Sequence, residues 1–462
     1  MMKLEYIGLK EIDGPLVVID KMQDVSYDEI IEIKMSSGEK RLGKITEATE
    51  DFAVAQVFEG TRGLSLTNTV TVPKGEPLKI GLSKEILGRT FDGVGRPVDG
   101  LGDIYAEQYK DINGMPMNPV SREYPRNYIK TGISAIDGLT TLIRGQKLPI
   151  FSGNGIPHNQ LAVQIANQAE IEGATEDNFA IVFAAMGVSG DVADYFKKSF
   201  EESGALERTV MYINLLNDPI VERITTPRCA LTAAEYLAFE CNMHVLVIMT
   251  DMTSYAEALR EISSSQGEIP SRKGFPGYLY SDLASMYERA GMLKGTEGSI
   301  TQIPILSMPN DDITHPIPDL TGYITEGQIV LERSLYQLGI YPPISVLPSL
   351  SRLMKDGIGK GFTREDHPDV ANQLFASYAN VQEIRALASV IGEDELSETD
   401  KLYLKFGREF ESKFVSQGMN ENRDINTTLQ IGWELLRMLP REELSRIDTK
   451  ILDKYYKTGG EE

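Results

Sequence analysis

The chain has 462 residues, of which 46 are basic and 68 acidic, and its formal net charge is -22. A length of this order exceeds what one hydrophobic core supports and indicates several domains. A surface this acidic repels a phosphate backbone, which argues against a nucleic-acid partner.

The sequence also argues against direct membrane insertion, secretion and a metal site. No apolar run approaches the roughly 18 residues that span a bilayer, and the first residues lack the apolar segment of a signal peptide. Cys229 and Cys241 are the only cysteines. On one predicted helix they lie too far apart to form a disulfide, consistent with an intracellular, reducing compartment. The histidines, at positions 158, 244, 315 and 367, show no metal-ligand spacing.

From the first residue to about position 74, short stretches alternate apolar and polar residues between Gly, Asp and Ser. Such alternation is typical of half-buried strands in a small barrel or sandwich. The expected strands are residues 16–19, 30–33, 53–58 and 69–72. We therefore predict an N-terminal β-barrel over residues 1–74.

Residues 75–345 combine continuous apolar strands, at 180–185, 210–213 and 245–249, with amphipathic helices. This pattern indicates a parallel sheet covered by helices on both faces, in an α/β domain. Thr226 and Pro227 are expected to begin a helix that runs to Glu240, with the threonine as N-cap and the proline in the first turn.

A glycine-rich loop lies between a short strand and a helix in this α/β region. Residues 147–150 precede Phe151, and an amphipathic run begins at Gln160. Between them stand Ser152, Gly153, Asn154, Gly155, Ile156, Pro157, His158 and Asn159. This is the spacing of the phosphate-binding motif G-x-x-x-x-G-K-[ST], although the segment by itself also fits a plain Gly-rich turn.

Three replacements remove the chemistry of that motif. Pro157 stands at the second glycine and has no N–H to offer a phosphate. His158 replaces the lysine and is mostly neutral at pH 7. Asn159 replaces the Ser/Thr whose hydroxyl enters a magnesium shell. The sequence therefore predicts a degenerate phosphate loop whose nucleotide binding is weak or lost.

The predicted strand at residues 245–249 is followed by Thr250 and Asp251. In phosphate-loop folds an acid at this place orders magnesium or its water. Asp251 equally fits the N-cap of the helix expected at residues 255–262. The two roles are compatible, and both stay open.

Residues 346–462 are predicted to form a C-terminal helical domain. Residues 371–391 and 399–416 are long amphipathic segments, and no strand pattern occurs from His367 onward. The last residues, 458–462, are expected to fray.

Three segments carry a resemblance to a known family. Residues 87–100 resemble the segment that enters the central domain of rotary ATPase head subunits, and residues 308–329 resemble a stretch specific to the B subunits. Residues 341–354 are similar to the family signature that ends in Ser-x-Ser-Arg, with Ser345 where F-type relatives more often carry asparagine. The chain as a whole resembles the non-catalytic, regulatory B subunit of an archaeal A-type or V-type rotary ATPase.

The resemblance implies an assembly. B subunits alternate with catalytic A subunits in a hexameric ring, and ATP or ADP with Mg lies at the interface with the A subunit. The B subunit itself is expected to bind no nucleotide tightly. Central stalk and peripheral stalk subunits are the further partners implied, in a complex at the cytoplasmic face of the membrane that couples ATP synthesis or hydrolysis to proton or sodium translocation.

The resemblance also implies roles for individual residues. Arg352 maps onto the arginine finger that reaches the A-subunit site in trans; taken alone it also fits a surface ion pair. Val188 and Ser189 stand where hydrolytic relatives carry Glu and Arg, so a water-positioning glutamate is lacking. The acidic residues that resemble the segment facing the rotating stalk, or that form a solvated capped turn, are Asp394, Glu395, Glu398 and Asp400.

Two other functions use the same core fold. A self-sufficient hexameric ATPase would need the chemistry that is missing at residues 157–159 and at Val188. An RNA translocase would need a basic channel that bears aromatic residues, which the acidic charge of the chain disfavours.

Overall fold

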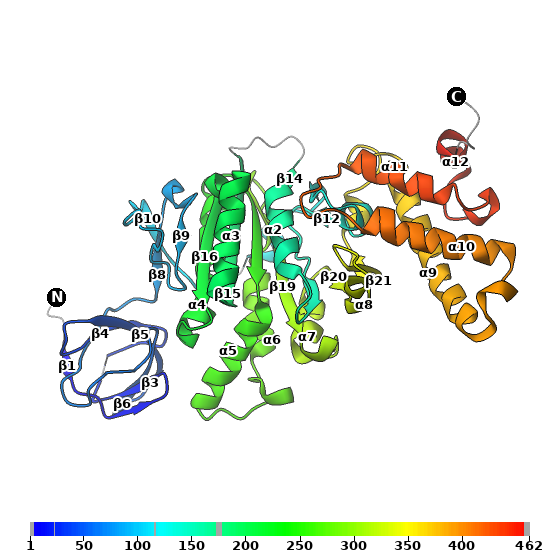
Figure 1. Cartoon of the computed structure of the whole chain (residues 1–462). Helices are drawn as coiled ribbons and strands as arrows, with labels where there is room; N and C mark the ends of the chain where they lie inside the picture. Colours follow the sequence, from blue (N-terminus) through cyan, green and yellow to red (C-terminus); the bar gives the residue numbers. More distant parts are fainter. Residues whose placement is uncertain (1–3, 23, 115–116, 172–177, 457–462) are drawn as a thin grey trace. The chain divides into compact units, whose positions relative to one another are not determined.

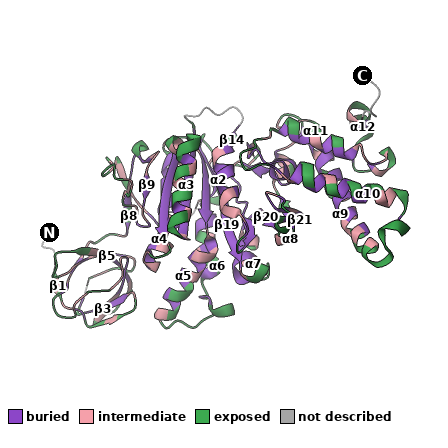
Figure 2. Ribbon diagram, in the orientation of Figure 1, coloured by how far each residue is buried: buried purple, intermediate pink, exposed green. Residues whose placement is uncertain are grey.

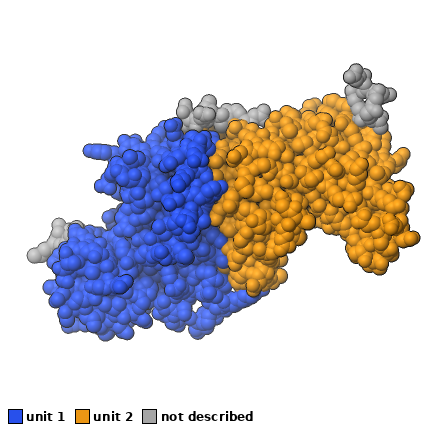
Figure 3. Space-filling model, in the orientation of Figure 1, with its two compact units in different colours: residues 1–117, 180–241, 249–289 blue, residues 118–179, 242–248, 290–462 orange. Residues whose placement is uncertain are grey.

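The computed structural model describes residues 4–22, 24–114, 117–171 and 178–456. The chain forms two compact units, shown in Figure 3. Unit 1 contains residues 1–117, 180–241 and 249–289, and unit 2 contains residues 118–179, 242–248 and 290–462. The expected fraying of residues 458–462 lies outside the described residues, and the domain boundaries after residues 74 and 345 stay a prediction.

The N-terminal part of unit 1 is the predicted β-barrel domain (Figure 1). Its seven strands pair antiparallel in the order β1-β7-β4-β5-β6-β3-β2. Because apolar and polar side chains alternate along these strands, the apolar side chains share the inner face of the sheet. On this face Val17, Ile19, Ile31 and Ile33 are fully buried. The strands are β1 (Tyr6–Ile7), β2 (Glu11–Asp13), β3 (Leu16–Asp20), β4 (Ile30–Lys34), β5 (Lys40–Ala48), β6 (Phe52–Val57) and β7 (Val70–Pro73).

The rest of unit 1 is α/β. Its parallel strands follow the order β15-β16-β9, and residues 180–186 of β15 are fully buried, as expected for a strand covered on both faces. The elements are β8 (Lys79–Leu82), β9 (Thr90–Phe91), β10 (Gln108–Asp111), β15 (Phe179–Val188), α3 (Gly190–Ser203), β16 (Thr209–Leu215), α4 (Ile220–Phe239), α5 (Met252–Ser265) and α6 (Leu279–Tyr287).

Unit 2 carries the strand order β21-β20-β13-β19-β17. Strand β13 is parallel to both β19 and β20, whereas β21 is antiparallel to β20. Strands β13 and β19 are buried along their whole length, and Figure 2 shows β19 in the buried colour. The elements are β11 (Tyr128–Lys130), α1 (Ser134–Leu139), β12 (Leu142–Ile143), β13 (Ile150–Gly153), α2 (His158–Gln168), β14 (Glu170–Ile171), β17 (His244–Thr250), β18 (Gly291–Met292), β19 (Ser299–Met308), α7 (Pro316–Ile324), β20 (Gly327–Leu331), α8 (Arg333–Gln337) and β21 (Ile344–Ser351).

The C-terminal part of unit 2 is helical, as predicted, and its described residues from His367 to 456 contain no strand. The predicted helix at 399–416 is a helix followed by a π-helical turn, Phe410–Val415. Fully or nearly fully buried aromatic rings fill this core: Phe406, Phe410, Phe414 and Trp433. The helices are α9 (His367–Ile391), α10 (Glu398–Glu409), α11 (Ile425–Leu436) and α12 (Thr449–Tyr455).

The predicted start of helix α4 was wrong. The helix begins at Ile220, so Pro227 lies inside it, and it ends at Phe239, before Cys241. Thr225 and Thr226 donate their hydroxyls to the carbonyl oxygen of Glu222, at 2.9 and 2.7 Å. A proline inside a helix costs about 3 kcal/mol, but this helix is buried on most of its surface, and that burial outweighs the local signal.

Trp433 links α11 to the start of α9 by a hydrogen bond. It is the only tryptophan of the chain, and its ring is fully buried. Its Nε1–H donates to Asp366 Oδ2 at 2.6 Å. The adjacent His367 ring is also fully buried, with Nε2 3.0 Å from Gly138 O and Nδ1 3.0 Å from Thr363 Oγ1. Tryptophan fluorescence therefore reports on the environment of His367.

We expect acid to weaken the helical domain through His367. Burial lowers the pKa of His367 from 6.5 to about 4. An unfolded histidine takes up a proton below pH 6.5 and the folded one only near pH 4, so stability falls as the pH drops through this window. The loss approaches about 3 kcal/mol near pH 4 at 1.36 kcal/mol per pKa unit, and about 2 kcal/mol of it falls between pH 7 and pH 5. Urea unfolding followed by Trp433 fluorescence at pH 7, 6 and 5 measures it, and His367→Gln, which cannot titrate, should flatten the dependence. Equal pH dependence in both proteins would contradict the prediction.

Candidate functional site

The altered phosphate loop joins strand β13 to helix α2. All residues of β13 are buried, Gly153 ends the strand, and the helix begins at His158. Gly155 has a φ of 78°, a left-handed conformation that glycine adopts without steric cost. The structure thus brings the predicted residues Ser152 to Asn159 together as a strand, a tight turn and the first helical turn.

Two backbone donors of this loop are used inside the loop. Ile156 N–H donates to Gly153 O at 3.2 Å, and His158 N–H donates to Ile156 O at 2.8 Å. Pro157, between them, has no N–H. A helix N-terminus binds phosphate by pointing such N–H groups at the anion. This loop presents fewer of them than an intact phosphate loop does.

The side chains that replace lysine and Ser/Thr do not restore the lost contacts. His158 Nδ1 lies 3.1 Å from Ser152 Oγ, so the ring turns back toward the strand. Asn159 Oδ1 is buried and accepts no hydrogen bond from any residue that the structure describes. An Asn amide at this position supplies no hydroxyl for a magnesium shell.

An ion pair that the sequence analysis missed lies against the loop. Asp311 accepts hydrogen bonds from Arg333 Nε at 2.7 Å and Nη2 at 2.9 Å, and the same Nη2 donates to Asn154 O at 2.9 Å. A Cβ at Gly153 would meet Asp311 Oδ1 at 2.0 Å, so any larger residue there would displace the Asp311 carboxylate. Asp311 has a φ of 55°, and nothing in its local sequence indicates that its carboxylate faces the loop.

These residues do not fit a tightly bound magnesium nucleotide. The fixed lysine charge and the hydroxyl are missing, and the Asp311 carboxylate lies against Gly153 at the end of β13. Within the ranges that the structure describes, no group of three or more His, Cys, Asp or Glu could hold a metal ion.

Asp251 and Val188 both belong to unit 1. Asp251 is the N-cap of α5, and its Oδ1 accepts the N–H of Thr253 at 2.8 Å. Val188 ends β15, and Ser189 precedes α3 without a side-chain cap. Asp251 therefore has the capping role that the sequence offered, and its vestigial nucleotide role stays a prediction.

Arg352 lies at one end of the sheet strands, and the loop lies at the opposite end. Ser351 pairs with Gly327, the first residue of β20, and Arg352 N–H donates to Glu326 O at 2.9 Å. Strand β20 runs parallel to β13, whose far end carries the loop. At about 3.3 Å per residue, Arg352 and the loop lie roughly 15–20 Å apart along the direction of the strands. The side chain of Arg352 is exposed, and within the described part of the chain no hydrogen bond or ion pair holds its guanidinium.

The predicted acidic residues form an exposed turn between α9 and α10. Asp394, Glu395 and Glu398 are exposed, and the buried Leu396 anchors the turn. Ser397 caps α10 by accepting the N–H of Asp400 at 3.1 Å and donates to its Oδ2 at 2.7 Å. The capped turn that the sequence offered as an alternative is therefore present, and the stalk contact stays a prediction.

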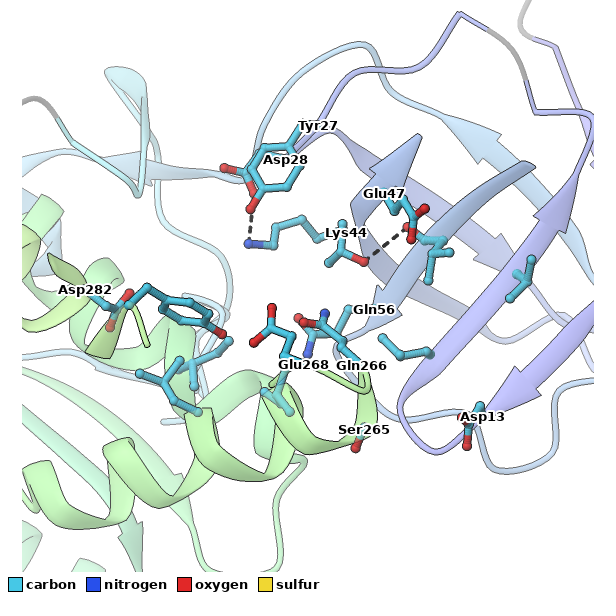
Figure 4. Close-up of a pocket in the computed structure, with 18 of the residues that line it drawn as sticks. Asp13, Tyr27, Asp28, Lys44, Glu47, Gln56, Ser265, Gln266, Glu268 and Asp282 are labelled. Atoms are coloured by element: carbon cyan, nitrogen blue, oxygen red, sulfur yellow. Dashed lines mark hydrogen bonds and ion pairs between the residues drawn. The ribbon is translucent and has the colours of Figure 1, made fainter. Parts of the chain in front are cut away.

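A hollow of about 840 Å³ in unit 1 contains none of the predicted site residues (Figure 4). Barrel residues and residues of α4, α5 and α6 line it. Its two basic residues are already paired: Lys44 with Asp28 at 2.9 Å, and Arg228 with Asp282 at 2.6 Å. The hollow therefore offers no unpaired cation for a phosphate.

Models of three domain families match consecutive parts of the chain. Residues 9–72 match the beta-barrel domain of the ATP synthase alpha/beta family, and residues 132–351 match its nucleotide-binding domain. Residues 356–456 match the C-terminal domain of V and A type ATP synthase. No helix among the described residues has both the length and the apolar character needed to cross a membrane.

Several relatives match over almost their whole length. The V-type ATP synthase beta chain 2 of Clostridium tetani is 62% identical over 457 residues, covering 99% of each chain. The B subunit of the A-type ATP synthase of Nitrosopumilus maritimus is 57% identical over 454 residues, covering 98% of each. A solved structure of the ATP synthase subunit NeqB from Nanoarcheaum equitans has a TM-score of 0.73 and 42% identity, and covers 92% of this chain and all of that one. The chain therefore belongs to the ATP synthase alpha/beta family, together with the V-type beta chains and A-type B subunits, and is a subunit of a rotary ATP synthase complex.

Proposed function

We propose that this chain is the non-catalytic, regulatory subunit of the ATP synthase head and supplies Arg352 to a neighbouring catalytic A subunit. The two kinds of subunit alternate in a hexameric ring at the cytoplasmic face of the membrane. The ring couples ATP synthesis or hydrolysis to proton or sodium movement through other subunits. Residues 1–74, 75–345 and 346–462 act as barrel, nucleotide-binding-fold and helical domains.

The position of Arg352 carries this proposal. The residue is exposed and its guanidinium is unpaired among the described residues, at the sheet edge opposite the loop of its own chain. A side chain cannot span that distance, which supports a role for Arg352 at a site on another subunit. Phosphoryl transfer spreads negative charge over the equatorial oxygens, and a planar guanidinium supplied in trans stabilises that charge.

The loop geometry supports the assignment of catalysis to the partner. Internal hydrogen bonds at Ile156 and His158, together with the Asp311 carboxylate, disfavour tight nucleotide binding in this chain. We therefore infer that ATP or ADP with Mg lies at the interface with the A subunit. The residues named for the degenerate site, from Ser152 to Asn159 with Asp251, keep the architecture of the fold without its hydrolytic chemistry.

The end of α9 supports a contact with the central stalk. Leu387, Val390 and Ile391 are exposed apolar residues, with Val390 82% exposed. They directly precede the acidic turn that contains Asp394 and Glu395. An apolar patch with an acidic rim is typical of an interaction surface. Peripheral stalk subunits complete the proposed set of partners.

The two other functions fit these observations less well. A self-sufficient ATPase would need the lysine and the catalytic glutamate that His158 and Val188 replace. An RNA translocase would need a basic channel, and the net charge of -22 opposes one.

Native mass spectrometry of the purified complex tests the proposed assembly. We expect equal copies of this chain and of one catalytic chain in the head, and no more bound nucleotides than catalytic chains. The loop of this chain should remain empty under dilution because two of its N–H donors are used internally and the lysine charge is missing. A ring made only of this chain, or stoichiometric nucleotide on this chain after isolation, would contradict the proposal.

A further inference from the structure

A buried glutamine lies directly behind Arg352. Gln146 is fully buried. Its Nε2 donates to Glu326 O at 3.2 Å and to Ser351 Oγ at 3.0 Å. Its Oε1 accepts the N–H of Ile143 at 2.9 Å. One amide group therefore joins the loop before β13 to the start of β20 and the end of β21, which lie side by side in Figure 1.

The same carbonyl oxygen connects Gln146 to Arg352. Glu326 O accepts the N–H of Arg352 at 2.9 Å as well as Gln146 Nε2. Ser351, the residue before the arginine, also donates its hydroxyl to Thr141 O at 2.9 Å. The backbone on which Arg352 stands is thus fixed from two sides, although its side chain is exposed.

Glu326 is itself held in place. Its carboxylate accepts the N–H of Lys147 at 2.8 Å and lies 3.0 Å from Lys147 Nζ. Gly327 follows with a φ of 141°, and a Cβ there would meet Leu350 O at 2.0 Å. Strand β21 therefore approaches β20 as closely as only glycine allows, and the position of its last residues is set by this packing.

We propose that Gln146 is a positioning residue for Arg352, which rests on the proposed function of that arginine. Gln146 fixes the backbone at Ser351 and Arg352, so that a long side chain enters the neighbouring site from one defined origin. Catalytic groups must be held within about 0.5 Å of the productive geometry by such supporting contacts. A displacement of about 1 Å can cost 10²-fold in rate.

The test uses Gln146→Met in the assembled complex with its catalytic subunits. Methionine keeps the length of the side chain but removes its hydrogen bonds. We expect kcat for ATP hydrolysis to fall about 10–100-fold, with KM for ATP little changed. Affinity for ADP with aluminium fluoride, a mimic of the transition state, should fall with kcat, while affinity for ADP alone should not.

Gln373→Met is the matched control. Gln373 is also buried, and its amide donates to Ser377 Oγ at 2.9 Å and Glu443 O at 3.3 Å and accepts Arg446 N–H at 2.9 Å. The same substitution therefore removes equivalent hydrogen bonds in the helical part of unit 2, and none of their partners belongs to the network of Gln146, Glu326 and Ser351. Its kcat should stay near that of the parent complex.

Combination with Arg352→Ala separates the possible outcomes. If Gln146 acts through Arg352, the double variant is no slower than Arg352→Ala alone. Three results would overturn the positioning role without affecting the proposed function. They are a further loss of turnover in the double variant, a raised KM for ATP in Gln146→Met, and unchanged turnover in Gln146→Met when Arg352→Ala is inactive. Full turnover in Arg352→Ala overturns both. If Gln146→Met fails to assemble, Ser351→Ala, which removes one smaller contact of the same network, decides by the same criteria.

Discussion

Replacement of Arg352 by alanine is expected to lower ATP hydrolysis by the assembled complex about 10³–10⁵-fold. This loss equals about 4–7 kcal/mol of barrier at 1.36 kcal/mol per tenfold. The chain should still fold and assemble, because the side chain is exposed and contributes to no ion pair among the described residues. The effect should fall on kcat more than on nucleotide affinity, because the charge that Arg352 stabilises develops in the transition state.

Arg352→Lys distinguishes an arginine finger from a general positive charge. An ammonium group is a point charge and cannot span two phosphate oxygens as a planar guanidinium does, so lysine should recover little activity. Arg62→Ala, at another exposed arginine, is the control and should leave turnover unchanged. Steady-state hydrolysis by complexes that carry each variant provides the measurement. Turnover within about threefold of the parent in Arg352→Ala, against the 10³-fold loss expected, would show that the site assignment is wrong.

The fold could be predicted because its signals are local. Alternation in the barrel strands, continuous apolar strands such as β15 and the helical period of α9 each belong to one short segment, and all three domain types were confirmed. The start of α4 could not be predicted in the same way. Pro227 is a strong local stop signal, but the burial of nearly the whole helix is a tertiary effect that no short window contains.

The candidate site likewise combines local features, which the sequence contains, with tertiary contacts, which it does not reveal. The degenerate loop is contiguous, so the residues that replace the motif, Pro157, His158 and Asn159, could be read from the sequence, although the family resemblance was needed to favour a phosphate loop over a plain Gly-rich turn. The pairing of Asp311 with Arg333 could not, since these residues meet only after the sheet has formed. Gln146 and Glu326 likewise come together only through strand order, and Gln146 carries no motif that would separate it from an ordinary buried amide.

The isolated chain is expected to bind Mg-ATP weaker by several powers of ten than a chain with an intact phosphate loop. Each charge-assisted phosphate contact is worth about 1.5–3 kcal/mol, and 1.4 kcal/mol is a factor of ten in affinity. At least two such contacts are lost, at His158 and at the N–H that Pro157 lacks. Isothermal calorimetry on the isolated chain measures the affinity, and a sub-micromolar Kd would refute the prediction.

Restoration of the motif alone should recover only part of that affinity, because the Asp311 carboxylate remains against the loop. The combined change Pro157→Gly, His158→Lys and Asn159→Thr returns the donor, the charge and the hydroxyl. Addition of Asp311→Ala should tighten binding by at least about another tenfold, since it removes a negative charge and leaves the Arg333 guanidinium beside Asn154 for the phosphates. Asp312→Ala is the matched control, because the Asp312 carboxylate accepts the N–H and hydroxyl of Thr314 at 2.9 and 2.6 Å in its own turn. Each of these two alanine changes is added to the three loop changes. Equal affinities for Mg-ATP in the two resulting variants would show that the Asp311 carboxylate does not oppose nucleotide binding.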